Sequence, residues 1–381
     1  MTTSVFYALG CRANQYQSEA LKGQYPGQIL KFGEKADIYI INTCTVTKDA
    51  DRKSRKIIKK ALKSAKRVIV YGCYARLNEK ELIKEFPSLE IISTKTGLPQ
   101  ITTDQKTKIR ANLMIEDGCE NFCSYCVIPF ARGKVIRKPL EEILGEAKIL
   151  LKNGAREIVL TGINLGAWGN LAPILKSLSP IKELLRIRLS SIEPQYVTKE
   201  LLKTMASLPK VCKHLHIPLQ SGDDKVLKAM NRKYSVKEYL HIIEGALKYL
   251  PECGITTDII VGFPGETEKE FQNTIKLVNQ IQFSRIHIFS YSLRELTSAS
   301  KLPDQIEEET KMKRYQVLEE LKTKYQNEFA HKYFGKEVEI LVESLNEGLT
   351  SNFLRVRFNN QDKSLISKLH KISLTRDNFK L

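Results

Sequence analysis

The sequence contains no long apolar segment and no internal repeat. None of its apolar runs approaches the ~20 residues that a membrane-spanning helix needs. Its first residues, Met1 to Tyr7, show no basic segment followed by an apolar one, so we expect no secretory signal. These absences argue against a membrane protein and predict a soluble, cytoplasmic one. The 381 residues, 42% of them hydrophobic, suffice for two or three domains, one of which could be a barrel of roughly 200 residues.

Acidic residues are too few to balance the basic ones. The chain has 61 Lys and Arg against 43 Asp and Glu, which gives a net charge of +18 and a pI near 9.4. Basic proteins bind nucleic acid through counterion release, whatever its sequence. The charge therefore indicates a polyanionic partner, although a ribosome-associated protein would have the same composition.

The eight cysteines do not have the pattern of a small secreted domain. In a long cytosolic chain such residues are metal ligands or free buried thiols more often than disulfides. Cys212 and Cys253 have no partner at a recognisable spacing, and we expect them to be core thiols. The other six fall into two sets of three.

One set lies in a single segment and lacks a fourth cysteine. Cys119, Cys123 and Cys126 are spaced C-x3-C-x2-C, with Tyr125 before the last. Three thiolates can hold three irons of a cubane cluster, which leaves the fourth iron open to a small molecule. A zinc knuckle that takes a distant fourth ligand is the alternative that the spacing leaves open.

The other set belongs to the first hundred residues, where strand patterns alternate with helix patterns. We expect strands at 5–9, 37–42 and 67–71 and helices at 15–24, 49–62 and 79–86, which predicts a parallel α/β unit. The three strands are followed by Cys11, Cys44 and Cys73. Strand ends of a parallel sheet share one edge, so these thiols should converge and could hold a second cluster. Gly10 and Gly72 would allow close backbone approach to it. Buried free thiols are the alternative.

A polar linker, 101–108, leads to a second series of strands and helices. Strand patterns cover 111–115, 157–161, 186–190, 214–219, 256–262 and 285–291, with helices at 140–152, 236–249 and 268–280 among the segments between them. This order predicts a parallel barrel or partial barrel, whose chemistry lies at the carboxyl ends of the strands. The C-x3-C-x2-C triplet follows the first of these strands, as that rule requires.

A long charged helix at 305–333 precedes the last fifty residues, which suffice only for a small β module. Strand patterns at 338–343 and 353–358 flank a turn at Asn346-Glu347-Gly348. Arg355 and Arg357 share one strand face. That face, with the lysines and arginines that follow it, either contacts RNA or is simply solvated.

Several polar residues mark strand ends of the predicted barrel. His214, His216, Pro218 and Gln220 alternate along one strand, which suggests a lined cavity. A zinc site at the two histidines is less favoured, because the nearby carboxylates lie past the strand. The segment Asp258 to Thr267 reads as a strand, a Gly/Pro turn and a helix start capped by Thr267.

The helix after Cys44 carries a run of basic residues with few acids to offset them: Lys48, Arg52, Lys53, Arg55, Lys56, Lys59, Lys60 and Lys63. It is either a solvated face or a surface that contacts phosphates.

The C-x3-C-x2-C triplet with its aromatic residue resembles the signature of the radical S-adenosylmethionine enzymes. The resemblance implies a 4Fe-4S cluster on Cys119, Cys123 and Cys126, whose open iron binds the amino and carboxylate groups of S-adenosylmethionine. It also implies reductive cleavage of that cofactor to a 5′-deoxyadenosyl radical. On this resemblance we expect Thr161, Gly162, Ser190, Glu193 and Gly262 to line the cofactor site.

Taken with Cys11, Cys44 and Cys73, the whole chain resembles the methylthiotransferases of that superfamily. This implies a second 4Fe-4S cluster on these three cysteines in an N-terminal domain, 1–108, a radical S-adenosylmethionine core barrel, 109–333, and a short TRAM-like, RNA-binding β domain, 334–381. The fold class expected is therefore α/β with a small C-terminal β unit.

The segments Asn42 to Thr47, Ala50 to Arg55 and Leu160 to Gly166 resemble the branch that modifies N6-threonylcarbamoyladenosine at position 37 of tRNA. That branch implies methylthiolation at C2 of the base, in the anticodon stem-loop, with one S-adenosylmethionine supplying the methyl group and a second the radical. A low-potential electron donor and a sulfur donor would also be needed. The alternatives are the same chemistry on a ribosomal-protein aspartate and a non-catalytic, zinc-bearing RNA-binding protein.

Overall fold

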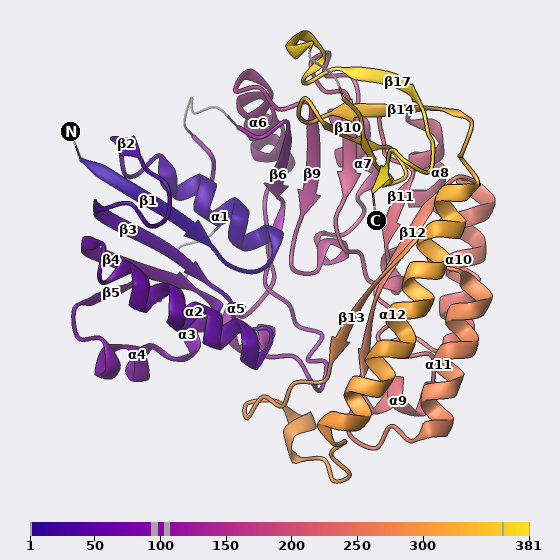
Figure 1. The fold of residues 1–381 in the computed structure, drawn as a ribbon, viewed down its shortest axis with the longest axis horizontal. Coiled ribbons are helices and arrows are strands. Elements are labelled where there is room, and N and C mark those ends of the chain that lie inside the picture. The colour runs from indigo at the N-terminus through magenta and orange to yellow at the C-terminus, as the bar shows by residue number, and fades with distance from the viewer. Residues whose placement is uncertain (1, 93–97, 103–106, 360–361, 381) are drawn as a thin grey trace.

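The computed structural model describes all residues except 1, 93–97, 103–106, 360–361 and 381. The described residues form two five-stranded sheets, two three-stranded sheets and a two-stranded hairpin (Figure 1). Part of the predicted linker at 101–108 lies outside the described residues. Within the described chain, no helix combines the length and the apolarity required to cross a membrane. The domain boundaries at 108/109 and 333/334 stay predictions.

The N-terminal sheet has five parallel strands in the order β2-β1-β3-β4-β5. Its strands are β1 Thr3–Ala8, β2 Gln28–Ile29, β3 Ala36–Thr43, β4 Ala65–Gly72 and β5 Leu89–Ile92, and its helices are α1 Arg12–Lys22, α2 Lys48–Ala61, α3 Cys73–Leu77 and α4 Glu79–Glu85. The predicted parallel α/β unit is confirmed. The sequence did not reveal β2, because two exposed residues carry no alternation.

A partial barrel of six parallel strands follows. Three of them pair as β10-β9-β6 and three as β11-β12-β13, and the parallel bridges Ile187↔Val211 and Ser191↔His216 join the two halves. The strands are β6 Arg110–Met114, β9 Glu157–Thr161, β10 Arg186–Leu189, β11 His214–His216, β12 Gly254–Val261 and β13 Arg285–Ser290. No pairing between β6 and β13 is found among the described residues, so the barrel is open on that side.

Helices cover the outside of the barrel strands (Figure 1). They are α6 Leu140–Lys152, α7 Ala172–Leu178, α8 Lys199–Ser207, α9 Asp224–Ala229, α10 Val236–Tyr249, α11 Glu268–Ile281 and α12 Glu308–His331. Shorter elements are α5 Ile128–Arg132, the hairpin strands β7 Glu116–Asp117 and β8 Ile136–Arg137, and 3-10 turns at Leu165–Trp168, Pro194–Tyr196, Ser298–Lys301 and Lys363–Leu365. The predicted helix at 305–333 begins three residues late, because the Gln305 side-chain amide caps the carbonyls of Ala299 and Leu302.

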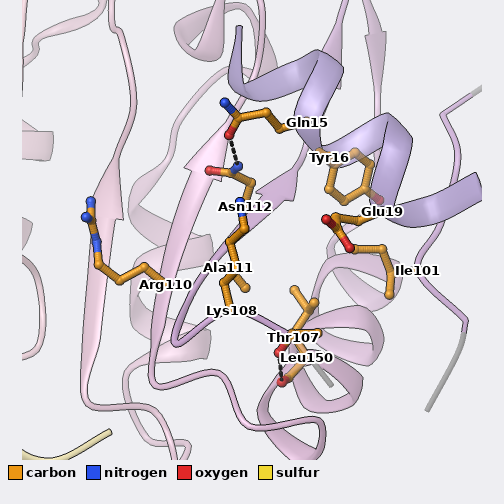
Figure 2. A pocket seen from close by; sticks show the side chains of 10 residues that line it. All are labelled: Gln15, Tyr16, Glu19, Ile101, Thr107, Lys108, Arg110, Ala111, Asn112 and Leu150. Atoms are coloured by element: carbon orange, nitrogen blue, oxygen red, sulfur yellow. Dashed lines mark hydrogen bonds between the residues drawn. The ribbon is translucent and has the colours of Figure 1, made fainter. Parts of the chain in front are cut away.

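The N-terminal unit packs against β6 at the open side of the barrel. The Tyr16 hydroxyl of α1 donates to Glu146 of α6, and Lys138 completes a buried cluster with both (Tyr16 Oη to Lys138 Nζ 2.8 Å). Beside it, Gln15 and Asn112 meet over a cavity of about 40 Å³ (Figure 2). Because the Tyr16 hydroxyl donates to Glu146 and accepts from Lys138, it links α1 to the barrel through two buried hydrogen bonds.

The C-terminal sheet is antiparallel, in the order β17-β14-β15-β16-β18. Its strands are β14 Glu337–Val342, β15 Glu347–Thr350, β16 Arg355–Arg357, β17 Leu369–Ser373 and β18 Phe379–Lys380. The predicted small β module is confirmed. The turn lies slightly earlier than predicted, at 344–346, because Glu347 and Gly348 already pair with Arg357 and Val356.

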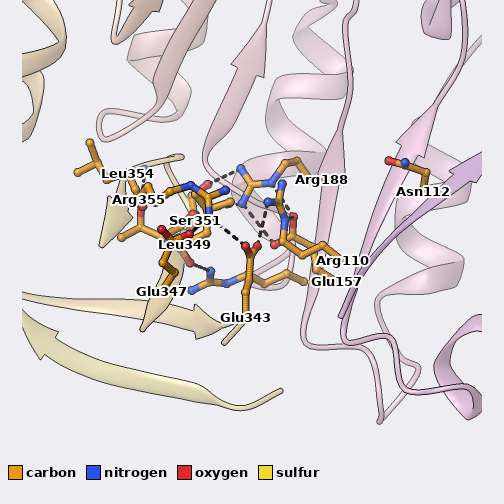
Figure 3. A network of polar contacts seen from close by, with 12 residues as sticks. Arg110, Asn112, Glu157, Arg188, Glu343, Glu347, Leu349, Ser351, Leu354 and Arg355 are labelled. Atoms are coloured by element: carbon orange, nitrogen blue, oxygen red, sulfur yellow. Dashed lines mark hydrogen bonds and ion pairs between the residues drawn. The ribbon is translucent and has the colours of Figure 1, made fainter. Parts of the chain in front are cut away.

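This sheet is attached to the amino-terminal ends of the barrel strands by a buried charged network (Figure 3). Glu157 accepts from Arg188 (2.7 Å) and Arg110 (2.9 Å), and Arg188 also donates to the carbonyls of Thr350 and Ser351. Phe353 stacks on His214 with ring centroids 4.4 Å apart. Arg355, proposed from the sequence as a solvated or RNA-facing residue, is instead paired with Glu343 and Glu347.

Candidate functional site

The central cysteine triplet lies in the loop between β7 and α5, at the carboxyl end of the barrel. The loop is held by backbone hydrogen bonds from Cys119 to Gly133 and from Ser124 to Met230. Phe122 adopts a left-handed φ of 47°, and the Asn231 side chain donates to its carbonyl at 2.9 Å. Strained backbone that persists in this way is typical of functional sites.

The three thiols are close enough to influence one another. Burial raises the pKa of Cys119 to about 11 and that of Cys126 to about 12, and the neighbouring Cys123 adds to both shifts. A buried thiol cluster of this kind is protonated unless a cation stabilises the thiolates. The donor set fits an iron-sulfur cluster with one iron lacking a protein ligand.

Arg232 connects this triplet with Glu193. Its Nη1 lies 3.3 Å from the Cys123 sulfur, and its Nη2 donates to the Glu193 carboxylate. Burial raises the pKa of Glu193 although Arg232 opposes the shift. The structure thus links Glu193 to the triplet through Arg232, while the expectation that Glu193 lines the cofactor site stays a prediction. The sequence missed Arg232, which follows the helix α9 and carries no motif of its own.

Thr161, Gly162 and Ser190 lie at the carboxyl ends of β9 and β10, where the sequence predicted them. Thr161 donates its hydroxyl to the Val159 carbonyl. A Cβ on Gly162 would come within 2.5 Å of the Glu116 carboxylate, so any other residue there would have to displace that carboxylate. The Ser190 hydroxyl is buried and has no hydrogen-bond partner among the described residues. Because buried polar atoms are nearly always satisfied, this hydroxyl fits a site that holds a polar ligand.

Gly262 follows β12 and has a left-handed φ of 70°. Its N–H donates to the Glu266 carboxylate, and a Cβ would come within 2.3 Å of the Lys311 side chain on α12. Packing against α12 thus explains the glycine. A role for Gly262 in cofactor binding stays a prediction. Burial raises the pKa of Glu266 to about 7 against the opposing effect of Arg314.

The second triplet converges at the carboxyl edge of the N-terminal sheet, as predicted. Cys11 precedes α1, Cys44 follows β3, and Cys73 begins α3. Burial raises the pKa of Cys44 to about 11, and the charges of Cys11 and Cys73 add to the shift. These three thiols likewise offer three sulfur ligands to a cluster.

The glycines before these cysteines have left-handed backbones, with φ of 87° at Gly10 and 96° at Gly72. A Cβ on Gly10 would lie 2.6 Å from the Cys44 sulfur. At Gly10 the close approach is therefore made by a cysteine side chain, whereas at Gly72 it is made by the Asn42 side chain and the Thr43 backbone.

Arg132 joins the two triplets. It lies on α5, just after the central triplet, and its Nε donates to the Cys73 sulfur of the other triplet at 3.2 Å. Its Nη1 pairs with Asp117 at 2.8 Å, and both side chains are almost fully buried. The sequence gave no indication of this residue, because 59 positions separate it from Cys73.

A pocket of about 160 Å³, here called the interdomain pocket, lies between the segment after Cys44 and the segment around Cys126. Its walls are mostly apolar, with Gln220 and Asp258 among the polar residues. The lining residues are Val46, Thr47, Tyr125, Cys126, Val127, Ile128, Gln220, Asp258, Ile260, Phe289, Ser290, Tyr291 and Ser292. Arg294 holds the two sides together through Asp51 and Thr45. The pocket is thus lined by Cys126 of the central triplet on one side and by Val46 and Thr47, which shortly follow Cys44, on the other, so a bound molecule would contact both segments.

Next to this pocket, the two histidines of β11 face the barrel interior as predicted. Ring nitrogens of His214 and His216 lie 3.1 and 2.9 Å from the Thr256 hydroxyl. The carboxylates past the strand do not approach them, because Asp223 caps α9. Instead Asp258 of β12 lies 3.2 Å from both His216 and His287. Although burial opposes it, these imidazoles hold the pKa of Asp258 well below its usual range.

Known proteins match this chain over its whole length. Residues 114–278 match the radical SAM superfamily and residues 3–94 the uncharacterized protein family UPF0004. Proteins named threonylcarbamoyladenosine tRNA methylthiotransferase MtaB are similar to it. The one from Bacillus subtilis is 33% identical over all of this chain and 95% of its own length, and the one from Aquifex aeolicus is 37% identical over 92% and 95%.

A tRNA-2-methylthio-N(6)-dimethylallyladenosine synthase from Endomicrobium trichonymphae is 34% identical over 90% of this chain and 88% of its own length. Among solved structures, the radical S-adenosylmethionine methyltransferase TsrM from Kitasatospora setae has the same fold, with a TM-score of 0.59 at 13% identity over 79% and 77% of the two chains. Because relatives more than 30% identical align with nearly the full chain, it belongs to the radical S-adenosylmethionine methylthiotransferase family.

Proposed function

We propose that this protein converts N6-threonylcarbamoyladenosine at position 37 of tRNA into its 2-methylthio derivative. The observation that carries the proposal is the interdomain pocket, which is lined by Cys126 of the central triplet on one side and by Val46 and Thr47, shortly after Cys44, on the other. The resemblance of the segment after Cys44 to the threonylcarbamoyladenosine branch, together with relatives of that name, favours this base over the dimethylallyl one.

The family uses S-adenosylmethionine and two 4Fe-4S clusters. We assign one cluster to Cys119, Cys123 and Cys126 and the other to Cys11, Cys44 and Cys73. The bound cofactors supply radical chemistry at an unactivated C–H bond, which no side chain can deprotonate. We place S-adenosylmethionine at the central triplet, beside Thr161, Gly162, Ser190, Glu193 and Gly262.

The residues of the chain then have separate tasks. Arg232 neutralises charge beside Cys123 and orients Glu193. Arg132 holds the second triplet against the first. The apolar walls of the interdomain pocket exclude water, which would otherwise quench reactive species. An adenine must leave its stack to reach such a pocket, at a cost that is smaller in a loop than in a duplex.

The basic face of α2 supports tRNA as the substrate. Five of its residues, together with Lys63 just after the helix, surround a shallow surface depression of about 350 Å³; the five are Arg52, Arg55, Lys56, Lys59 and Lys60. The first residue of α2, Lys48, donates its N–H to Ser292 at the rim of the interdomain pocket. The basic face therefore leads away from the pocket, where the backbone of a bound stem would continue. Such binding would take place in the cytoplasm.

The test is methylthiolation by the anaerobically reconstituted protein of two otherwise identical tRNAs, one with threonylcarbamoyladenosine and one with dimethylallyladenosine. We expect the 2-methylthio nucleoside by mass spectrometry only from the first. Product from the dimethylallyl tRNA alone would contradict the choice of base. Absence of product from both, with product on a ribosomal protein, would contradict tRNA as the substrate. The electron donor and the sulfur donor have to be supplied chemically in this assay.

A further inference from the structure

Strand β13 is the last strand of the barrel and has a neighbour, β12, on one side only within the described chain (Figure 1). Side chains of a strand alternate between its two faces. On the face that points into the barrel, the two strands pair in three rungs: Thr256 with Arg285, Asp258 with His287, and Ile260 with Phe289. Asp258 contacts both His287 and His216 of β11, so this face is the one toward which β11 also points its histidines.

The two outer rungs belong to different cavities. Ile260 and Phe289 line the interdomain pocket. Thr256 and Arg285 line a second cavity of about 330 Å³, between the barrel and the C-terminal sheet. Four residues of a strand span about 13 Å. The ladder of β12 and β13 thus joins the proposed base pocket to a second cavity a short distance away.

The β13 side chains of these rungs are a cation, an imidazole and a phenyl ring. Phe289 is 40% exposed, and the His287 side chain is 45% exposed. The Arg285 Nε atom is buried and has no hydrogen-bond partner among the described residues. The other cations of the second cavity, Arg355 and Lys380, are paired with Glu347. Arg285 is therefore the cation there that still lacks an acceptor within the described chain.

Exposed aromatic rings beside unpaired cations are how proteins hold single-stranded nucleic acid, since each base has a face for stacking and each phosphate needs a donor. An exposed edge strand could instead add a strand from a partner protein. That mode uses backbone groups and does not call for a half-buried arginine whose Nε lacks an acceptor. A net charge of +18 also favours a polyanion.

We propose that the inner face of β13 is a track for single-stranded RNA. Phe289 stacks on the target base in the interdomain pocket, His287 contacts the adjoining nucleotide, and Arg285 binds a backbone phosphate in the second cavity. This inference rests on the proposed function, because it takes the anticodon loop of tRNA as the single strand.

The experiment measures the affinity of the full-length protein for an anticodon stem-loop RNA, by fluorescence anisotropy at several salt concentrations, for Phe289→Leu and Arg285→Gln. Phe289→Leu should weaken binding about tenfold, since it keeps an apolar side chain but removes the stacking ring. Arg285→Gln should weaken binding and reduce the slope of log affinity against log salt by about 1. Matched controls are Tyr315→Leu, a similarly exposed aromatic on α12, and Lys237→Gln on α10, which should bind as the wild type does.

Thermal unfolding identifies variants that are merely misfolded. If Phe289→Leu is one of them, Phe289→Tyr takes its place: it keeps a stacking ring and should bind as the wild type does. Wild-type affinity in both Phe289→Leu and Arg285→Gln would overturn the track. An equal loss of affinity for a blunt duplex of the same stem, or binding of a ribosomal-protein peptide in place of the loop, would overturn it as well. If the wild-type protein forms the methylthio product and both variants bind the RNA normally, the track is contradicted but the proposed function is not. Loop binding that depends on Phe289 without any product contradicts the proposed function and leaves the track supported.

Discussion

The two cysteine triplets offer the same three ligands but are built in different ways. Cys119, Cys123 and Cys126 come from one loop of eight residues, and backbone hydrogen bonds within and around that loop hold them. Cys11, Cys44 and Cys73 come from the ends of three strands and meet only when the N-terminal sheet is complete. A local site is specified by spacing, whereas the distributed site is specified by topology.

The contrast extends to what each site touches. The central triplet is next to Arg232 and Glu193, both of the barrel. The N-terminal triplet takes Arg132, a barrel residue, as a partner of Cys73. The distributed triplet thus depends on its own sheet and on the docking of two units. We therefore expect disruption of packing to harm it first.

The largest expected effect follows from removing one ligand of the local triplet. Cys119→Ala should reduce reductive cleavage of S-adenosylmethionine to background, because the three-thiolate set is incomplete. Chromatographic detection of 5′-deoxyadenosine checks this. Iron content should fall from about eight per chain to about four. Substantial cleavage by this variant would mean that the cofactor binds elsewhere.

Arg132→Met tests the connection between the triplets. Removing Arg132 from its buried ion pair with Asp117 should cost about 3–5 kcal/mol, because a buried pair that loses one partner is strongly destabilised. Chemical denaturation should show this loss, and Asp117→Asn in the same chain should recover part of it. A loss of less than 1 kcal/mol in the single variant would show that Arg132 does not fix the two units together.

The far end of the barrel offers a test that spares both triplets. Burial opposes ionisation of Glu157, but Arg188 and Arg110 lower its pKa to about 2, from an ordinary value of 4.5. The carboxylate therefore contributes stability above about pH 4.5 that is lost as the pH falls toward 2. The contribution amounts to about 3 kcal/mol. Glu157→Gln should lack this acid dependence in unfolding measurements between pH 5 and 3. The same acid dependence in both proteins would assign it to other carboxyl groups.

A smaller loss of stability distinguishes two costs of replacing Gly10: overlap with the side chain of Cys44 and strain of the backbone. Gly10 and Gly33 both have left-handed φ values, but a Cβ on Gly10 would overlap Cys44, whereas one on Gly33 has no atom within 4 Å. Gly33→Ala should cost about 1 kcal/mol, and Gly10→Ala about 1–3 kcal/mol more. Gly10→Ala should also lose iron from the N-terminal site only. Equal losses in both variants would show that Cys44 is not tightly packed.

Much of this architecture could be predicted, since it depends on patterns along the chain. The bounds of β9, α6 and α10 agree with the predicted ones to the residue. The convergence of Cys11, Cys44 and Cys73 followed from the rule that strand ends share an edge. Glu193 was expected to line the cofactor site because it lies in the segment that follows a barrel strand, and this expectation stays a prediction.

The residues that were missed depend on side-chain direction between distant segments. Arg132, Arg232 and Asp258 act through contacts across 59, 109 and 42 positions, to Cys73, Cys123 and His216 respectively. No local pattern marks such pairs. The short strands β2, β5 and β18 were missed for a different reason, because two to four residues are too few to show alternation.

The most direct test of the account is the product formed by Cys44→Ala on tRNA that carries threonylcarbamoyladenosine. If the local triplet cleaves S-adenosylmethionine and the distributed triplet is needed for sulfur transfer, this variant should still form 5′-deoxyadenosine. It should give no 2-methylthio nucleoside by mass spectrometry. Formation of the methylthio product by Cys44→Ala would contradict the division of labour between the two triplets.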